Sequence, residues 1–254
     1  MKVYFLGTGT SQGIPVIGSN HPVCKSTDPR DKRLRVSVWI SWENASYVID
    51  CGPDFRQQML TSNCQKVDGI LFTHEHADHT AGLDDIRPFY FKQGDIPFFA
   101  HQRVLENLTK LFDYIFEKEN KYPGAPSVEI NEVVNGKSFL IGDKMAVPID
   151  VMHGNLQVFG YRIDDFAYLT DVKTISEKEI EKLKGVKVLV VNALRIEPHD
   201  KHFNLEEALR FIEIIKPERT YLTHISHIFG FHEEIEKTLP ENVFLAYDNL
   251  EITI

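Results

Sequence analysis

Cysteine is scarce in this sequence, with only Cys24, Cys51 and Cys64 among 254 residues. Three scattered thiols are too few for a disulfide framework, so we expect the reducing cytoplasm as the compartment. No apolar run is long enough to cross a bilayer, and the first residues lack the pattern of a secretory signal. We therefore expect no membrane partner.

Positively charged residues are also few: the sequence has 28 Lys and Arg but 37 Asp and Glu, which gives a formal net charge of −9. A protein that grips nucleic-acid backbone needs a broad basic face, so a nucleic-acid partner is not expected. The one basic run, Lys25–Arg35, also contains Asp28 and Asp31. It could hold a phosphate or form a solvated loop, and both interpretations stay open.

Short apolar runs bounded by Gly, Pro, Asn or Asp predict strands, and helical spacing predicts helices between some of them. The predicted strands are Val3–Leu6, Val36–Ile40, Ser46–Ile49, Gly69–Phe72, Phe98–Ala100, Met145–Val151, Val158–Ile163, Phe166–Leu169, Val186–Val191, Thr220–Leu222 and Val243–Ala246. The predicted helices are Gln102–Glu119, Ser176–Leu183, Leu205–Ile215 and Glu233–Leu239. This mixture indicates an α/β (α+β) fold with packed sheets and outer helices, and residues 1–254 are expected to form one domain.

Histidine is plentiful, with 11 residues, and it clusters. The predicted strand Gly69–Phe72 leads into Thr73–His79, which holds His74, His76, Asp78 and His79. Four such donors in six residues, with H-x-H-x-D-H spacing, indicate a metal site rather than a solvated polar loop. Imidazole and carboxylate suit Zn, Mn or Fe, and the absence of cysteine here leaves the choice open.

This motif resembles that of the metallo-β-lactamase superfamily, and the resemblance implies a four-layer αββα sandwich with two divalent metal ions at one edge. It also implies three further ligands, each at a predicted strand end: His153, Asp171 and His224. Taken singly, each of the three could be an ordinary hydrogen-bonded residue. By the resemblance, one ion is held by His74, His76 and His153, the other by Asp78, His79 and His224, and Asp171 is shared.

Three segments resemble one branch of that superfamily: Phe5–Pro15, Leu222–His227 and Tyr247–Ile252. The branch holds the cyclic phosphodiesterases of the carbon–phosphorus lyase pathway and, more distantly, the RNase Z-like tRNA 3′-processing endonucleases. The resemblance implies Asp78 and His202 as catalytic residues. His202 would stabilise the charge of the transferring phosphoryl group or protonate the leaving oxygen. The alternative for His202 is a surface histidine near a helix start.

The same branch implies an additional structural zinc site, for which His21, Cys24 and His227 are the candidate ligands. Two cysteine positions of the branch's pattern are Ser19 and His21 in this sequence. Three good ligands still suit tetrahedral zinc with a water or a weak fourth donor. A loop without metal is the alternative.

The sequence therefore predicts a metal-dependent phosphodiesterase that hydrolyses a small cyclic or nucleotide-like phosphodiester by means of a hydroxide bridging two metals. The alternatives are tRNA 3′ processing, and thioester or lactam hydrolysis on the same fold. A di-iron redox protein and a non-catalytic binding module are less favoured, because the predicted ligand set is complete and its first two members are both histidine. The natural substrate and the physiological metal are left open, and so is a homodimer.

Overall fold

The apolar runs of the sequence become strands of two separate sheets in the computed structural model, which describes residues 1–254. The first sheet has seven strands in the order β15-β1-β2-β3-β4-β5-β6, and β3 to β6 are parallel. Its strands are β1 (Lys2–Gly7), β2 (Ser37–Trp42), β3 (Ala45–Ile49), β4 (Gly69–Leu71), β5 (Ile96–Ala100), β6 (Val128–Glu132) and β15 (Glu251–Thr253).

The second sheet has eight strands in the order β11-β8-β9-β10-β12-β13-β14, and β7 pairs with β8 outside this path. The strands are β7 (Phe139–Ile141), β8 (Lys144–His153), β9 (Leu156–Ile163), β10 (Phe166–Tyr168), β11 (Thr174–Ile175), β12 (Val188–Asn192), β13 (Arg219–Thr223) and β14 (Val243–Leu245). All eleven predicted strands are present. The sequence analysis missed β6, β7, β11 and β15, which are short or lie at the ends of the sheets.

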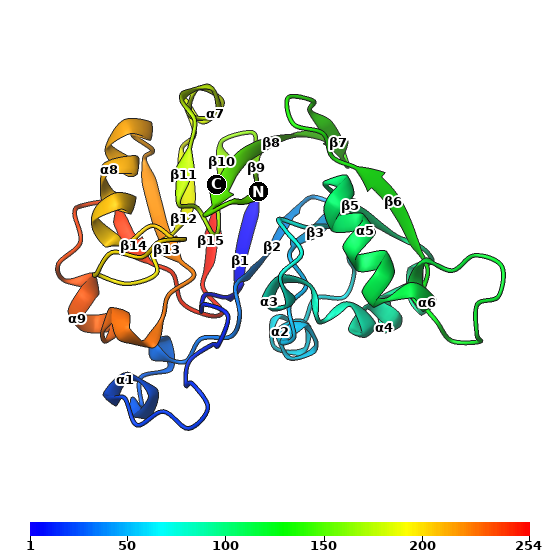
Figure 1. Cartoon of the computed structure of the whole chain (residues 1–254), viewed down its shortest axis with the longest axis horizontal. Helices are drawn as coiled ribbons and strands as arrows, with labels where there is room; N and C mark the ends of the chain where they lie inside the picture. Colours follow the sequence, from blue (N-terminus) through cyan, green and yellow to red (C-terminus); the bar gives the residue numbers. More distant parts are fainter.

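Helices cover the outer side of each sheet, with α8 and α9 on one side of the molecule and α2, α4 and α5 on the other (Figure 1). The helices are α1 (Pro22–Lys25), α2 (Phe55–Ser62), α3 (Ala77–Thr80), α4 (Arg87–Gln93), α5 (Gln102–Leu111), α6 (Asp113–Phe116), α7 (Glu177–Glu181), α8 (Leu205–Ile215) and α9 (His232–Glu236). Short 3₁₀ turns span Pro29–Asp31, Leu83–Ile86 and His227–Phe229. None of the helices combines the length and the apolar character that a membrane crossing requires.

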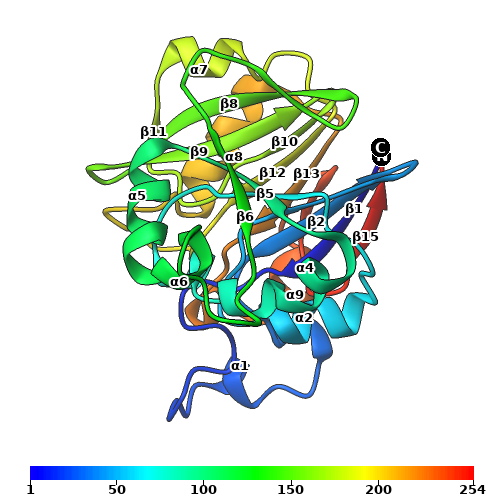
Figure 2. The same cartoon turned by 90° about the vertical axis from the view of Figure 1, so that its right-hand side faces the viewer.

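Three apolar cores hold these layers together. The largest, with 22 buried residues, lies between the two sheets and includes Phe5 from one sheet and Phe166 from the other. A second core packs the second sheet against α8, and a third packs the first sheet against α2 and α5. The predicted αββα sandwich is therefore confirmed, and the turned view of Figure 2 shows the same arrangement from the side.

The predicted helix Gln102–Glu119 is interrupted. It breaks at Phe112, whose φ of −128° and ψ of 44° are not helical, and α6 is a separate turn. The carboxylate of Asp113 accepts the backbone N–H of Tyr114, and the carboxylate of Glu117 accepts two further backbone N–H groups. Such local acceptors compete with helical hydrogen bonds, which ends the helix early.

The carboxyl ends of the central strands of both sheets face one edge of the sandwich. In the first sheet, β3 and β4 are parallel. In the second sheet, β10, β12 and β13 are parallel. Strand β8 runs in the same direction as β10, because β9 is antiparallel to both. Strand ends that share an edge bring together residues far apart in sequence. The chain termini meet elsewhere, where β1 pairs with β15 and the Met1 amine donates to the carbonyl of Ile254 at 2.9 Å.

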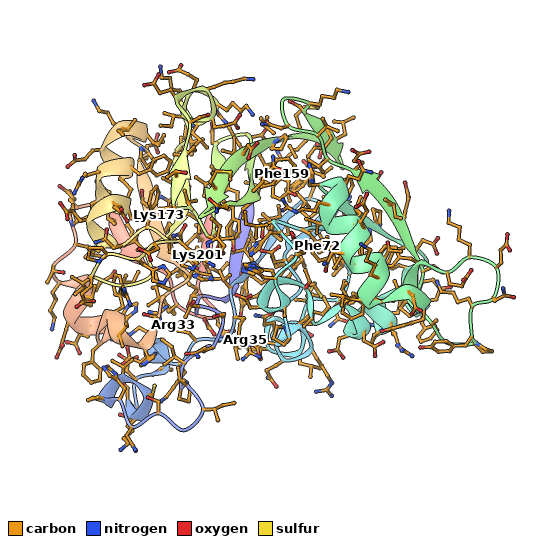
Figure 3. All side chains as sticks on the ribbon, in the orientation of Figure 1. Arg33, Arg35, Phe72, Phe159, Lys173 and Lys201 are labelled. Atoms are coloured by element: carbon orange, nitrogen blue, oxygen red, sulfur yellow. The ribbon has the colours of Figure 1, made fainter.

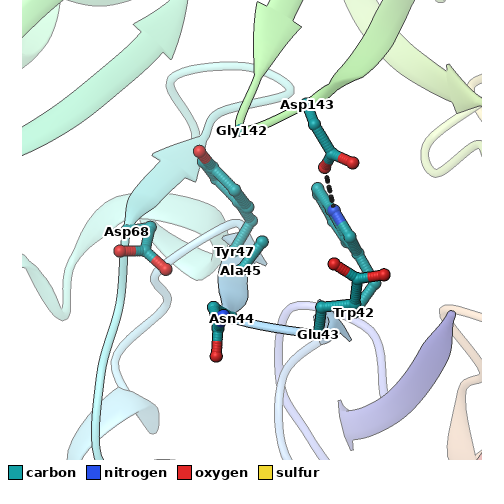
Figure 4. Close-up of a pocket in the computed structure, with 8 residues that line it drawn as sticks. All are labelled: Trp42, Glu43, Asn44, Ala45, Tyr47, Asp68, Gly142 and Asp143. Atoms are coloured by element: carbon teal, nitrogen blue, oxygen red, sulfur yellow. Dashed lines mark hydrogen bonds between the residues drawn. The ribbon is translucent and has the colours of Figure 1, made fainter.

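The opposite edge carries an open hollow of about 470 Å³ between the β2–β3 and β7–β8 turns (Figure 4). The stacked rings of Trp42 and Tyr47 line it, and the Trp42 indole N–H donates to Asp143 at 2.5 Å. Tyr47 pairs with Gly69, the first residue of β4, whereas the histidine-rich motif follows the end of that strand. The hollow is therefore separate from the predicted metal centre.

Candidate metal centre

The H-x-H-x-D-H motif turns directly from strand into helix. Strand β4 ends at Leu71, and α3 begins at Ala77 after His76. This tight turn places the His74 Nε2 and His76 Nδ1 atoms 3.0 Å apart. His74 and His79 are fully buried, whereas His76 is exposed.

The second sheet brings its three predicted ligands to the same place. His153 ends β8, Asp171 follows β10, and His224 follows β13. The two carboxylate oxygens of Asp171 lie 3.3 Å from His79 Nε2 and 3.4 Å from His224 Nε2. The rings of His76 and His153 have their centroids 5.4 Å apart.

The remaining member, Asp78, lies on the His79 side of the cluster. Its Oδ2 atom is 3.3 Å from His79 Nε2 and 3.8 Å from His224 Nε2. All seven predicted metal ligands therefore meet in one cluster between the two sheets. Their assignment as ligands remains our proposal.

Asp50 belongs to this site although the sequence analysis did not name it. Its buried carboxylate lies 2.7 Å from His79 Nδ1 and accepts both the backbone N–H and the hydroxyl of Thr73 at 2.8 Å. A carboxylate on one ring nitrogen fixes the tautomer and aims the other nitrogen, here Nε2, at the cluster. The available signal was a lone Asp directly after a buried strand, β3.

His153 is oriented in a similar way by a backbone carbonyl. Its Nδ1 lies 2.8 Å from the carbonyl oxygen of Lys201, an acceptor, so Nδ1 carries the proton. The Nε2 atom of His153 is then free to act as a ligand.

The residues present fit divalent metal ions. Buried nitrogens of His79, His202 and His224 have no hydrogen-bond partner, which is costly unless something else binds them. Three groups of donors lie close enough to share an ion, each with its ligand atoms within 4.8 Å of one another: His74, His79 and Asp171; Asp78, His79 and His224; His153, Asp171 and His202. Asp171 belongs to two of the groups, as a shared ligand would.

The electrostatics of the cluster also favour a bound cation. Burial alone lowers the pKa of His79, but the carboxylates of Asp50, Asp78 and Asp171 raise it well above its ordinary value. Burial alone raises the pKa of Asp171, yet His224 and His79 hold it well below its ordinary value. Carboxylates that stay ionised beside buried imidazoles create a negative site, which suits a divalent ion.

His202 lies inside the cluster rather than on the surface. Its ring centroid is 4.4 Å from that of His153 and 4.8 Å from that of His224, and its Nδ1 is 3.6 Å from Asp171 Oδ1. The adjacent Phe203 donates its N–H to the carbonyl of Val172, which ties this segment to the strand end that carries Asp171. Burial, followed by the neighbouring His224, lowers the pKa of His202 to about 2, so its imidazole is neutral in the metal-free protein.

The candidate structural zinc ligands lie near one another without forming a compact set. The His21 and His227 ring centroids are 5.1 Å apart. His21 Nδ1 accepts the N–H of Val23, and the buried Cys24 sulfur accepts the N–H of Val16. His21, Cys24 and His227 are not among the groups whose donor atoms all lie within 4.8 Å. A zinc ion at these three residues stays a prediction.

Comparison with known proteins gives concordant matches. A model of the beta-lactamase superfamily domain matches residues 46–225. A solved structure described as a new diphosphatase of the PhnP family has a TM-score of 0.93 and 37% identity, and the match covers 100% of this chain and 97% of that one.

Two curated relatives are longer than this chain. An octanoyltransferase of Porphyromonas gingivalis is 39% identical over 100% of the chain but only 52% of its own length. A ribonuclease Z of Methanocaldococcus jannaschii is 25% identical over 87% of the chain and 62% of its own length. The chain thus spans about half to three-fifths of these relatives.

The αββα sandwich, the His and Asp cluster at its edge and the family match agree with one another. The chain belongs to the metallo-β-lactamase superfamily, in the branch that includes the PhnP-family diphosphatase and ribonuclease Z.

Proposed function

We propose that this chain is a metal-dependent hydrolase that cleaves a small cyclic or nucleotide-like phosphodiester. Its site is the cluster of His74, His76, Asp78, His79, His153, Asp171 and His224. The observation that carries the proposal is the position of His202, buried beside Asp171 but outside the predicted ligand set. A hydrolase of phosphodiesters needs such a group, because an alkoxide departs poorly without a proton or added charge stabilisation.

The residues have distinct roles in this proposal. When bound, two divalent ions supply Lewis acidity and an activated water. Asp171 holds the two ligand sets at a fixed spacing, and Asp50 keeps His79 in the orientation that faces the cluster. An anionic phosphoryl group beside His202 would raise the pKa of its imidazole in the substrate complex. His202 would then protonate the leaving oxygen or donate a hydrogen bond to the phosphoryl group. The identity of the metal, Zn or Mn or Fe, is open, and so is any extra zinc at His21, Cys24 and His227.

A phosphoanhydride is the second candidate for the scissile bond. It is favoured by the similarity to a diphosphatase that this chain matches over nearly its whole length. A diphosphate presents the same disubstituted phosphorus, but its leaving group is a phosphate, which needs less help from an acid. The two candidates therefore differ in how strongly they depend on His202.

The names of the curated relatives describe longer proteins. Octanoyl transfer is the activity in the name of a protein of which only 52% matches this chain. The net charge of −9 disfavours a long nucleic-acid substrate. Because tRNA 3′ processing is an alternative, the test includes a precursor tRNA. Thioester or lactam hydrolysis would leave His202 without a role.

The test compares wild-type protein with His202→Ala on four substrates: a cyclic ribose phosphodiester, a bis(aryl) phosphodiester, a dinucleoside diphosphate and a precursor tRNA. Loss of a positioned acid should slow the cyclic ribose substrate by roughly 10²–10⁴-fold, with a smaller loss on the aryl substrate. Equal losses on both would assign His202 to stabilisation of phosphoryl charge. Metal content is measured in parallel, and Arg210→Gln, which breaks an exposed ion pair on α8 away from the cluster, serves as the control. A variant that keeps its metals and full activity on every substrate would overturn the proposal.

A further inference from the structure

The hollow between the β2–β3 and β7–β8 turns lies at the far ends of two strands that lead to the metal centre (Figure 4). Asp68 lines the hollow and directly precedes β4, and the histidine-rich motif follows the other end of that strand. Asp143 also lines it and directly precedes β8, which ends at His153. The buried side chains of Phe72 and Phe159, labelled in the middle of the molecule in Figure 3, lie along the way. A ligand in the hollow would therefore contact both sheets without entering the cluster.

Three carboxylates line the hollow, those of Glu43, Asp68 and Asp143. Glu43 is exposed in the β2–β3 turn and forms no ion pair within the chain. Asp143 accepts the indole N–H of Trp42, and this hydrogen bond lowers the pKa of the Asp143 carboxyl, which keeps it ionised. Only Asp68 has a cationic partner, because its Oδ1 lies 2.6 Å from the Lys66 ammonium. The charges of Glu43 and Asp143 are thus left without a counter-charge.

A buried hydroxyl group faces the same hollow. Tyr47 is only 6% exposed, and its ring stacks on that of Trp42. Its phenol oxygen points towards Gly142 on the opposite turn, where an added Cβ atom would lie 3.8 Å from it, and the hydroxyl hydrogen has no acceptor within the chain. Burial and then the carboxylates of Asp68 and Asp143 raise the pKa of Tyr47, so the phenol is neutral and stands in a negative field. Such an oxygen can accept a hydrogen bond from a cation.

The arrangement of these groups indicates which kind of cation fits. The nearby ammonium of Lys144 pairs with Asp164 and lies over the Trp42 ring, 5.8 Å from its centroid. The oxygens of the three carboxylates do not all lie within 4.8 Å of one another, so a single metal ion does not reach all of them. The hollow of about 470 Å³ has room for an elongated organic molecule instead. Positive charges at both ends of such a molecule would match carboxylates that stand on separate turns.

We propose that the hollow is a binding site for an aliphatic diamine or polyamine, whose ammonium groups bind Glu43 on one turn and Asp143 on the other. One ammonium also donates to the phenol oxygen of Tyr47, and the methylene groups of the ligand lie against Trp42 and Ala45. A ligand that bridges the two turns connects the two sheets at the edge opposite the metal centre, so it stabilises the folded chain. This site is independent of the proposed function.

The experiment is calorimetric titration of the purified protein with spermidine at low salt, with hydrolysis not measured. Glu43→Gln and Asp143→Asn should each raise the Kd for spermidine about tenfold, the loss expected of one charge-assisted contact. Tyr47→Phe should raise it about threefold, as the loss of a neutral hydrogen bond does. Glu213→Gln, at an exposed glutamate of α8 without an ion pair, is the matched control and should leave the Kd unchanged.

Two probes of equal length test whether the ligand bridges the turns. Butane-1,4-diamine should bind at least about tenfold more tightly than butylamine, which has the same carbon chain but one ammonium group. Spermidine should also raise the Tm of the wild type more than that of the Glu43→Gln, Asp143→Asn double variant. The site does not exist if spermidine fails to bind, or if Glu213→Gln weakens binding as much as Glu43→Gln does. Equal affinities for the diamine and the monoamine would likewise contradict it, because the attraction would then be that of any acidic surface.

Discussion

Asp171 is the residue on which the two halves of the cluster meet. Its oxygens face His79 on one side and His224 on the other, and it shares a further donor group with His153. It is buried, so no solvent group can take over if its carboxylate is removed.

Asp171→Ala should therefore remove activity more completely than loss of either terminal histidine, His76 or His224. Loss of the shared carboxylate disturbs both ligand sets, whereas loss of a terminal histidine disturbs one. Metal analysis after dialysis should find less than one ion per chain in the variant and about two in the wild type. Retention of both ions with near-normal turnover would show that Asp171 is not shared.

The H-x-H-x-D-H spacing predicted four of the donors, and the resemblance to the superfamily implied His153, Asp171, His224 and His202. Seven candidate ligands and His202 could be named, and the structure brings all eight together. Asp50 was missed because a single carboxylate after a strand carries no spacing signal.

Among the elements, α5 reaches the metal motif through one side chain. Arg103, in its first turn, binds both carboxylate oxygens of Glu75 at 2.9 and 3.0 Å and donates to the carbonyl of Gln157 at 2.6 Å. Glu75 stands between His74 and His76, and Gln157 lies in β9 of the other sheet. Arg103 therefore joins the motif to both sheets without touching the cluster, and we regard it as a positioning residue.

Arg103→Gln should lower the metal affinity about tenfold, the smaller end of the range seen when groups that orient ligands are removed. The exchange of both partners, Glu75→Arg with Arg103→Glu, should recover part of that loss, and competition with a chelator measures it. Arg210→Gln, which breaks an exposed Arg–Glu pair on α8, is the control. An affinity equal to that of the wild type would reduce the Arg103 contact to an ordinary surface ion pair.

Element boundaries were less predictable than element types. The helix expected over Gln102–Glu119 stops where side-chain carboxylates compete for the backbone, and no periodicity in apolar residues reports that competition. The basic run Lys25–Arg35 is not a wholly solvated loop. Arg33 is buried, and it donates to Thr8 and to a backbone carbonyl far along the chain, so part of the run is structural.

At the scale of the whole molecule, the cluster connects the two sheets, because its predicted ligands come from both. His74, His76, Asp78 and His79 come from the first sheet, whereas His153, Asp171 and His224 come from the second. Ions bound to both sides would stabilise the packing of one sheet on the other, because the unfolded chain cannot assemble the same ligand set.

Metal removal should therefore lower the thermal stability as well as abolish activity. With free ion at about 100 times its Kd, binding contributes roughly 2.7 kcal/mol, which corresponds to a Tm increase of about 5–10 °C for a chain of this size. Calorimetry of chelated and reconstituted protein measures the difference. In Asp171→Ala, the Tm should be almost the same with and without metal. If the Tm of the wild type does not change on metal removal, the bound ions do not stabilise the packing of the two sheets.

The backbone dihedral φ also distinguishes the edge of the sandwich that carries the predicted metal ligands. Nine residues other than glycine have a positive φ, and six of them are exposed residues in turns or at a helix end. The three that are buried are Asp50, Asp171 and His224, with φ of 65°, 57° and 57°. A sequence selected only for stability would place glycine or asparagine at these positions. Redesign of this protein towards a consensus for rigidity would thus erase its chemistry first, and the three positions should be held fixed in any such design.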